Sequence, residues 1–189
     1  TIDRPRYTDL NPFKTFLNDF NFNTGNPNLQ PSFNNKFTLS WNHQNTWFIA
    51  TYFLYTKDLL SDVPFQNNTN NTLNIQSINL NYELQYSIDL ATYQYINKSW
   101  YTGVSASLFY MENETKAIQS GNADVVSSTT GFYLNSFNRF NMSEDRTLSM
   151  DIDVSYLSSI LFGTYEWGGS FVTNVSFNKS IWKRRAQLT

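Results

Sequence analysis

The chain has 189 residues, a mass of 22.0 kDa, a formal net charge of −2 and no cysteine. Aromatic residues make up 17% of it and charged residues only 15%, against about 25% charged in an ordinary soluble domain. No basic run exceeds the one at 183–185, which excludes an extended surface for nucleic acid. The lack of cysteine excludes disulfides, thiolate metal sites and a cysteine nucleophile.

The first ten residues are polar and contain Pro5, so they do not form a secretory leader. An exported protein without such a leader must be a mature part or a fragment, and we interpret residues 1–189 as one incomplete segment without a signal peptide. The longest nearly unbroken apolar stretch, Trp47 to Tyr55, is about half the ~20 residues that a membrane-spanning helix requires. Any crossing of a bilayer must then be made by strands.

A loop followed by two strands is expected in the first third of the chain. Gly25 permits a positive φ, and Pro27 and Pro31 forbid helix, so residues 25–31 predict a loop that leads into a strand. Alternation then indicates a strand around 37–41. A second strand is expected over 47–55, after a tight turn at 43–46.

The clearest alternation in the chain predicts a third strand with one apolar and one polar face. We expect the apolar row to face lipid and the polar row to face the lumen of a barrel. The apolar row is Ile78, Leu80, Tyr82, Leu84, Tyr86 and Ile88; the polar row is Asn79, Asn81, Glu83, Gln85, Ser87 and Asp89.

Weaker alternation predicts further strands over 100–110, 130–134 and 165–177. A second strong pattern lies between the last two of these. Its expected lipid-facing row is Leu148, Met150, Ile152 and Val154, and its expected lumen-facing row is Ser149, Asp151, Asp153 and Ser155. Several of the seven candidate strands are about 10 to 13 residues long, which favours transmembrane strands, because strands of globular sheets cluster near 5 to 6.

The connections are expected to alternate between short ones, such as 141–146 and 178–184, and long ones, at 57–71 and 112–125. Outer-membrane barrels have short periplasmic turns and longer extracellular loops, so His43, Met142 and Lys183 are predicted on the periplasmic side. Tryptophan and tyrosine gather near the predicted strand ends, as in the aromatic girdles of such barrels. The predicted interface aromatics are Trp41, Trp47, Trp100, Tyr110, Tyr156, Trp167 and Trp182.

The sequence offers little for catalysis. The one histidine, His43, falls in a predicted turn without a nearby activating carboxylate. Asp151 and Asp153 share a strand face and could form a carboxylate pair, but a polar lumen wall explains them as well. We expect no catalytic, cofactor-binding or metal site, and no enzymatic activity.

Four short segments carry a resemblance to a known family: Arg4-Pro5-Arg6-Tyr7, Leu10-Asn11-Pro12, residues 25–31 (Gly-Asn-Pro-Asn-Leu-Gln-Pro) and residues 55–58 (Tyr-Thr-Lys-Asp). They resemble the outer-membrane β-barrel family related to TonB-dependent receptors that is abundant in Bacteroidetes. The resemblance implies a large barrel, commonly of 22 strands, with a plug and energised uptake of a nutrient or siderophore. This chain shows no plug or TonB-contacting segment, so it corresponds to a C-terminal part of the barrel.

The predicted fold class is therefore an all-β, antiparallel transmembrane β-barrel, of which this chain supplies about seven to eight strands. The predicted function is an outer-membrane transport component. Expected partners are membrane lipid, the remainder of the parent barrel, TonB, a surface lipoprotein and a small-molecule or oligomeric ligand, with no nucleic acid. Two alternatives stay open: a soluble or surface-attached β-sandwich that binds carbohydrate or protein, and a structural or adhesin barrel.

Overall fold

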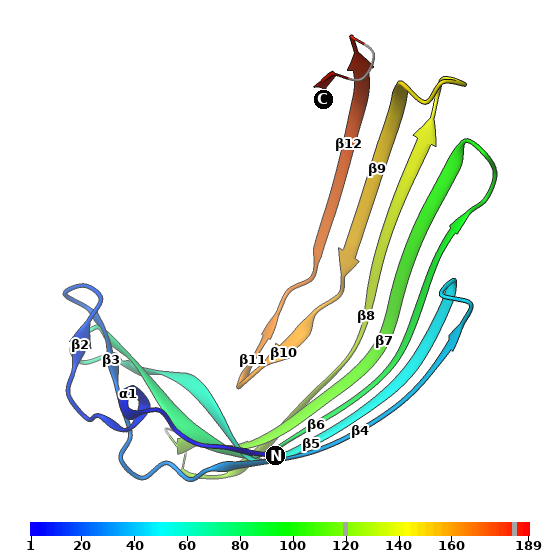
Figure 1. Cartoon of the computed structure of the whole chain (residues 1–189). Coiled ribbons are helices and arrows are strands. Elements are labelled where there is room, and N and C mark those ends of the chain that lie inside the picture. The colour runs from blue at the N-terminus through cyan, green and yellow to red at the C-terminus, as the bar shows by residue number, and fades with distance from the viewer. Residues whose placement is uncertain (119–120, 183–184) are drawn as a thin grey trace.

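The computed structural model describes residues 1–118, 121–182 and 185–189, and its long strands form one strongly curved sheet (Figure 1). No helix in these residues is long and apolar enough to cross a membrane. The elements are β1 (Ile2–Asp3), α1 (Tyr7–Leu10), β2 (Thr15–Phe16), β3 (Asn21–Thr24), β4 (Ser32–His43), β5 (Trp47–Asn67), β6 (Thr72–Tyr95), β7 (Trp100–Lys116), β8 (Asp124–Asn141), β9 (Leu148–Leu157), β10 (Ile160–Phe162), β11 (Tyr165–Trp167), β12 (Ser170–Ile181) and β13 (Ala186–Leu188).

Seven long strands of the described chain, β4 to β9 and β12, pair antiparallel with their neighbours in sequence order. Each of the seven strand regions expected from alternation overlaps one of them, and the all-β antiparallel prediction is confirmed. In the part of the chain that the structure describes, the sheet does not close on itself. It is a meander, in which each long strand pairs, among the long strands, only with those that precede and follow it in the chain.

The prediction of two long loops, at 57–71 and 112–125, is wrong, because strands occupy most of both segments. β5 has 21 residues and β6 has 24, and their pairing continues to Asn67 and Thr72, which leaves only residues 68–71 as a turn. Likewise β7 continues to Lys116 and β8 begins at Asp124. These segments lack clean alternation, but pairing between the two strands of each hairpin satisfies their backbone hydrogen-bonding groups. Strands therefore extend well past the 9–11 residues that cross a bilayer.

A single left-handed residue interrupts the longest hairpin. Asp58 has φ 55°, and it does not pair with Asn81, although Lys57 pairs with Tyr82 and Leu59 with Leu80 on either side. The register is the same on both sides of Asp58, so this is not a bulge with an extra residue, but a residue outside the extended conformation interrupts the regular alternation of side chains between the two faces. Alternation counted from one end of β6 therefore cannot be carried through to the other end.

The tight turn expected at 43–46 is confirmed, with residues 44–46 joining β4 to β5 and with Gln44 and Asn45 at positive φ. The turn between β8 and β9 is held by Asp145, which accepts hydrogen bonds from the backbone and the hydroxyl of Thr147. Hydrogen bonds from Ser143 and Thr147 lower the pKa of Asp145 to about 2. Both turns thus contain side chains suited to their backbone.

The N-terminal segment, residues 1–31, packs on the extended part of β5 and β6. β3 runs parallel to the start of β6, where β7 does not reach. Around α1, Arg6 forms an ion pair with Asp9 at 2.9 Å, and this hydrogen-bonded contact holds the pKa of the Asp9 carboxyl below its usual range. The backbone N–H of Gly25 donates to Asn11 O at 2.9 Å. The Asn-Pro and Gly-Asn-Pro segments that carry the family resemblance therefore meet in space.

Gly25 is required by this contact, because a Cβ there would lie 2.4 Å from the backbone oxygen of Asn11. We expect Gly25→Ala to push residues 9–11 off the sheet and to destabilise the segment by about 1–3 kcal/mol, the usual cost of overpacking. Limited proteolysis of the N-terminal segment measures this. The matched control is Gly168→Ala, where a Cβ would meet nothing within 4 Å; equal cleavage of the two variants would contradict the assignment.

Candidate membrane and lumen surfaces

One face of the seven-strand sheet is mainly apolar from β4 to β12, because the strand registers bring the apolar positions side by side. One row, for example, runs from Leu39 through Thr51, Ile88 and Leu108 to Phe132. We call this surface the apolar face. Its members are Phe37, Leu39, Trp41, Ile49, Phe53, Tyr86, Ile88, Leu90, Val104, Ala106, Leu108, Phe132, Leu134, Met150, Ile152, Val154, Tyr156, Phe171, Val175 and Phe177.

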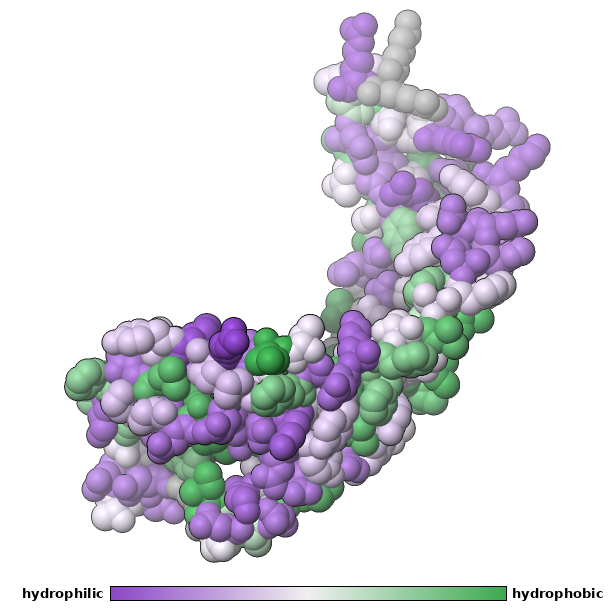
Figure 2. Space-filling model, turned by 60° about the horizontal axis from the view of Figure 1, so that its bottom comes forward, coloured by the Kyte–Doolittle hydropathy of each residue, from purple (hydrophilic) through white to green (hydrophobic). Residues whose placement is uncertain are grey.

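The apolar face is uncovered in the described part of the chain. Leu39 is 63% exposed, Ile88 60% and Leu108 56%. Figure 2 shows hydrophobic side chains gathered along the outer curve of the sheet, with hydrophilic side chains towards both ends. The second sheet that the described residues form is the small β10–β11 hairpin. A β-sandwich, which needs a second layer over these rows, is therefore not the architecture of the described chain.

Aromatic side chains border the apolar face on the side where β5 to β8 continue towards the connections at 68–71 and 117–123. The rings of Phe53 and Tyr86 lie 5.1 Å apart, and those of Tyr86 and Tyr110 lie 6.3 Å apart. The hydroxyls of Tyr82 and Tyr110 both donate to Glu112, from Tyr82 at 2.7 Å. Glu112 is the next residue after Tyr110 on the same face of β7, and its carboxylate marks the end of the apolar face.

A second aromatic border lies near the short turns. Trp100 stacks on Phe140 at 5.5 Å between ring centroids, and its Nε1–H donates to Asn138 at 3.1 Å. Trp41 stacks in the same way on His43 at 5.6 Å. An indole with an apolar body and one satisfied polar atom suits a boundary between hydrocarbon and water.

The distance between the two borders matches a bilayer. On β7 the borders are marked by Trp100 and Tyr110, which are about 33 Å apart along a strand that rises ~3.3 Å per residue. A tilt of about 40°, as in outer-membrane barrels, reduces this to about 25 Å, the height of their apolar band. The apolar face thus has the dimension of a hydrocarbon core.

The remaining predicted interface aromatics have mixed positions. Tyr156 lies on the apolar face, between Leu134 and Phe171. Trp167 lies in β11 and Trp182 in the turn after β12, so neither belongs to a long strand. Trp167 was expected within one strand over 165–177, but Gly168 and Gly169 divide that segment. Lys183 lies outside the described residues.

The opposite surface of the sheet, which we call the polar face, is polar but contains several aromatic rings that simple alternation did not indicate. The β10–β11 hairpin lies on the inner side of the curve (Figure 1), and its Ile160 lines a cavity with Gln85, Ser87 and Phe109 of this face, so the polar face lies on the inner side. Ser105, for example, faces Asn135, which faces Ser155 on the next strand. Its members include Ser40, Tyr52, Glu83, Gln85, Ser87, Asp89, Ser105, Ser107, Phe109, Tyr133, Asn135, Phe137, Arg139, Ser149, Asp151, Asp153, Ser155, Asn174, Ser176 and Asn178.

Asp151 is the centre of a charged cluster on the polar face. Arg139 Nη2 lies 2.7 Å from Asp151 Oδ2, and Arg139 Nε donates to Asp151 Oδ1 at 2.8 Å. Asn178 adds a hydrogen bond to the same carboxylate at 3.1 Å. The partner of Asp151 is thus Arg139 and not Asp153, and the described residues contain no group of three or more acidic or histidine side chains that could hold a metal ion.

Part of the predicted row on β6 is not where alternation placed it. Ile78 and Leu80, expected to face lipid, are 7% and 0% exposed. Ile78 lines a cavity of about 260 Å³ together with Thr115 and Ser127, which belong to the polar-face positions of β7 and β8. The change of face occurs beyond the interruption at Asp58, where the regular alternation between the two faces ends.

Asn79 and Asn81, expected to line the lumen, make structural contacts. Asn79 Oδ1 accepts from the backbone N–H of Gln30 at 2.8 Å, and its amide donates to the carbonyls of Gln30 and Asp58. Asn81 donates to Glu114 at 2.6 Å. The extended part of β6 therefore holds the N-terminal segment.

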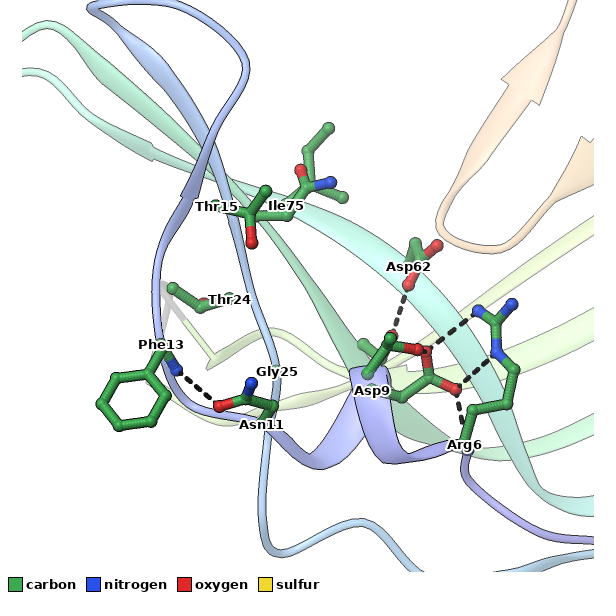
Figure 3. Close-up of a pocket in the computed structure, with 12 residues that line it drawn as sticks. Arg6, Asp9, Asn11, Phe13, Thr15, Thr24, Gly25, Asp62 and Ile75 are labelled. Carbon is green, nitrogen blue, oxygen red and sulfur yellow. Dashed lines mark hydrogen bonds and ion pairs between the residues drawn. The ribbon is translucent and has the colours of Figure 1, made fainter.

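The same segment encloses a cavity of about 270 Å³ between α1 and the extended strands (Figure 3). The Arg6–Asp9 ion pair lies at its edge, and Asp62 faces it from β5 and accepts a hydrogen bond from Ser77. The charged groups that line it are thus already paired with side chains of this chain. The cavity results from the docking of the N-terminal segment.

A sheet with an apolar outer band of bilayer height, aromatic borders and a polar inner face defines a transmembrane β-barrel protein. The chain matches the Outer membrane protein beta-barrel family over residues 1–189. It belongs to this family, and its location is the bacterial outer membrane. No curated protein and no solved structure matches it.

Proposed function

We propose that this chain is part of an outer-membrane transport protein that takes up a nutrient or siderophore in the manner of TonB-dependent receptors. The observation that carries the proposal is the division of one sheet into the apolar face and the polar face. In this proposal the apolar face contacts lipid, and the polar face lines a hydrated lumen along which a ligand moves.

The polar face supports transport because its groups combine hydrogen bonding with aromatic surface. Ser, Asn and Asp side chains alternate there with rings such as Tyr52, Phe109 and Tyr133. Such a surface can hold a polar ligand weakly at many places, as release further along the lumen requires. The proposal includes no catalytic step.

The parent barrel is proposed to contain further strands, because the outer edge of β4 is bonded by β1 at Ser32 and Phe33 and by Thr1 at Asn34, and the described residues supply no partner beyond that point. Backbone groups exposed to hydrocarbon cost several kcal/mol each, so residues 35–43 need a partner strand. Lipid, the rest of the barrel, TonB and a surface lipoprotein are the proposed partners.

Uptake by the native bacterium tests the proposal. A strain without the gene, a strain without TonB and the wild type are grown under iron limitation and on a panel of oligosaccharides. We expect one condition in which both deletions cause the same growth defect, with complementation restoring it. Normal growth throughout, together with loss of adhesion in the gene deletion, would instead identify a structural or adhesin barrel.

A further inference from the structure

The connection between β9 and β12 folds inward as a two-stranded hairpin, β10–β11, across the inner side of the curved sheet (Figure 1). Ile160 of the hairpin lines a cavity with Phe109 and Met111 of β7. These two residues occupy polar-face positions, so the hairpin covers the polar face.

The base of the hairpin is fixed to β8. Ser158 N–H donates to Phe132 O at 2.9 Å, and Phe132 N–H donates to Ser158 Oγ at 2.8 Å. Beneath this contact a Cβ at Gly131 would lie 2.6 Å from Ser158 Oγ and 2.2 Å from the ring of Phe109. A glycine at this position lets the hairpin and an aromatic ring lie directly against the strand.

The tip of the hairpin reaches three strands farther, to β5. The side-chain amide of Asn113, on β7, donates to the carbonyl of Gly163, and Asn113 is only 1% exposed. A Cβ at Gly163 would lie 2.5 Å from Ser61 Oγ, on β5. The hairpin therefore spans the sheet from β8 to β5.

Packing within the hairpin shows that it is docked on the sheet. Leu161 is 7% exposed, which places it among the few buried apolar side chains of the described chain. Thr129, on β8, lies 3.5 Å from the Glu166 carboxylate and donates a hydrogen bond to it. A loop that buries its own apolar side chain and is hydrogen-bonded at base and tip is held in a defined position.

We propose that the β10–β11 hairpin is the constriction of the lumen and sets the largest molecule that can pass along the polar face. This inference rests on the proposed transport function. The strands β5 to β8 continue past the end of the apolar face. The hairpin crosses the polar face near the point where this continuation begins (Figure 1). A molecule that follows the polar face must pass beside it.

The position of the hairpin can be tested without any transport measurement, because the chain contains no cysteine. An ideal Cβ at Gly163 lies 3.8 Å from Ser61 Cβ, and disulfides join Cβ atoms about 3.8 Å apart. We expect Ser61→Cys/Gly163→Cys to form an intramolecular disulfide in intact outer membranes, detected by mass spectrometry of the linked peptides. The matched control, Ser61→Cys/Gly168→Cys, should stay reduced.

The selective role is tested by removing residues 160–167 from the intact protein. Leu157 pairs with Ser170, so the remaining Ser158, Ser159, Gly168 and Gly169 still join β9 to β12 in register. We expect this deletion to make cells several-fold more sensitive to vancomycin, a large antibiotic, with no change for a small one. The disulfide-locked variant should be as resistant as the wild type.

The outcomes separate the two proposals. A missing Ser61–Gly163 cross-link, or unchanged vancomycin sensitivity after deletion despite normal protein levels in the outer membrane, overturns the constriction. Increased sensitivity in a strain whose TonB-dependent growth is normal in every condition supports the constriction and contradicts energised uptake.

Discussion

Leu134→Arg is expected to prevent stable insertion of the protein into the outer membrane. Leu134 lies in the middle of the apolar face, between Ala106 and Tyr156 on the adjacent strands. A lipid-facing arginine near the bilayer midplane costs about 2–4 kcal/mol, which is a large part of the stability of a typical domain. The loss is measured as the amount of folded, heat-modifiable protein in outer-membrane fractions.

Asn135→Arg is the matched control, because its neighbours Ser105 and Ser155 lie on the polar face. An arginine there stays hydrated, so we expect normal insertion. Leu84→Arg would be a less decisive variant, since Leu84 pairs with Glu112, which could neutralise the new charge. Equal losses from Leu134→Arg and Asn135→Arg would contradict the assignment of the two faces.

Asp151→Ala is expected to lower the free energy of unfolding by about 2 kcal/mol. The substitution removes a bidentate contact with Arg139 and a hydrogen bond from Asn178, and charge-assisted hydrogen bonds contribute about 1.5–3 kcal/mol. The Arg139 side chain is 49% exposed, so water offsets part of the loss. Urea unfolding in lipid vesicles, followed by tryptophan fluorescence, measures the change.

Asp153→Ala tests whether this effect belongs to the ion pair or to any acidic group on the polar face. Asp153 faces Phe137 and Asn174, and it makes no hydrogen bond or ion pair to another residue that the structure describes. We expect a change below about 0.5 kcal/mol, as for an ordinary surface substitution. A similar loss in both variants would remove the special role of the Arg139–Asp151 pair.

The sequence predicts the strands and their two faces well where alternation is uninterrupted. In β6 the pattern from Leu84 to Leu90 corresponds to one exposed apolar row, with Tyr86 46% and Ile88 60% exposed. Alternation reports only which residues share a side of a regular strand. It failed from Leu80 backwards, because the backbone change at Asp58 lies on the neighbouring strand and leaves no signal in β6 itself.

Tertiary contacts explain the features that sequence analysis missed. The Arg139–Asp151 pair joins two strands, and its geometry depends on a register that spacing does not reveal. The inward β10–β11 hairpin was expected to be an ordinary connection followed by one strand. Its docking depends on Asn113 and Ser61, which are at least about 50 residues away in the chain, so only Gly168-Gly169 and the small Gly131 could have indicated it.

A nitroxide scan along β6 tests the central claim most directly. Single cysteines are introduced at positions 85 to 90 of the cysteine-free chain, spin-labelled, and exposed to oxygen, which dissolves in lipid, and to a water-soluble nickel complex. We predict that labels at Tyr86, Ile88 and Leu90 collide mainly with oxygen, and labels at Gln85, Ser87 and Asp89 mainly with nickel. The same accessibility at all six positions, or the reverse alternation, would contradict a sheet with one face in hydrocarbon and the other in water.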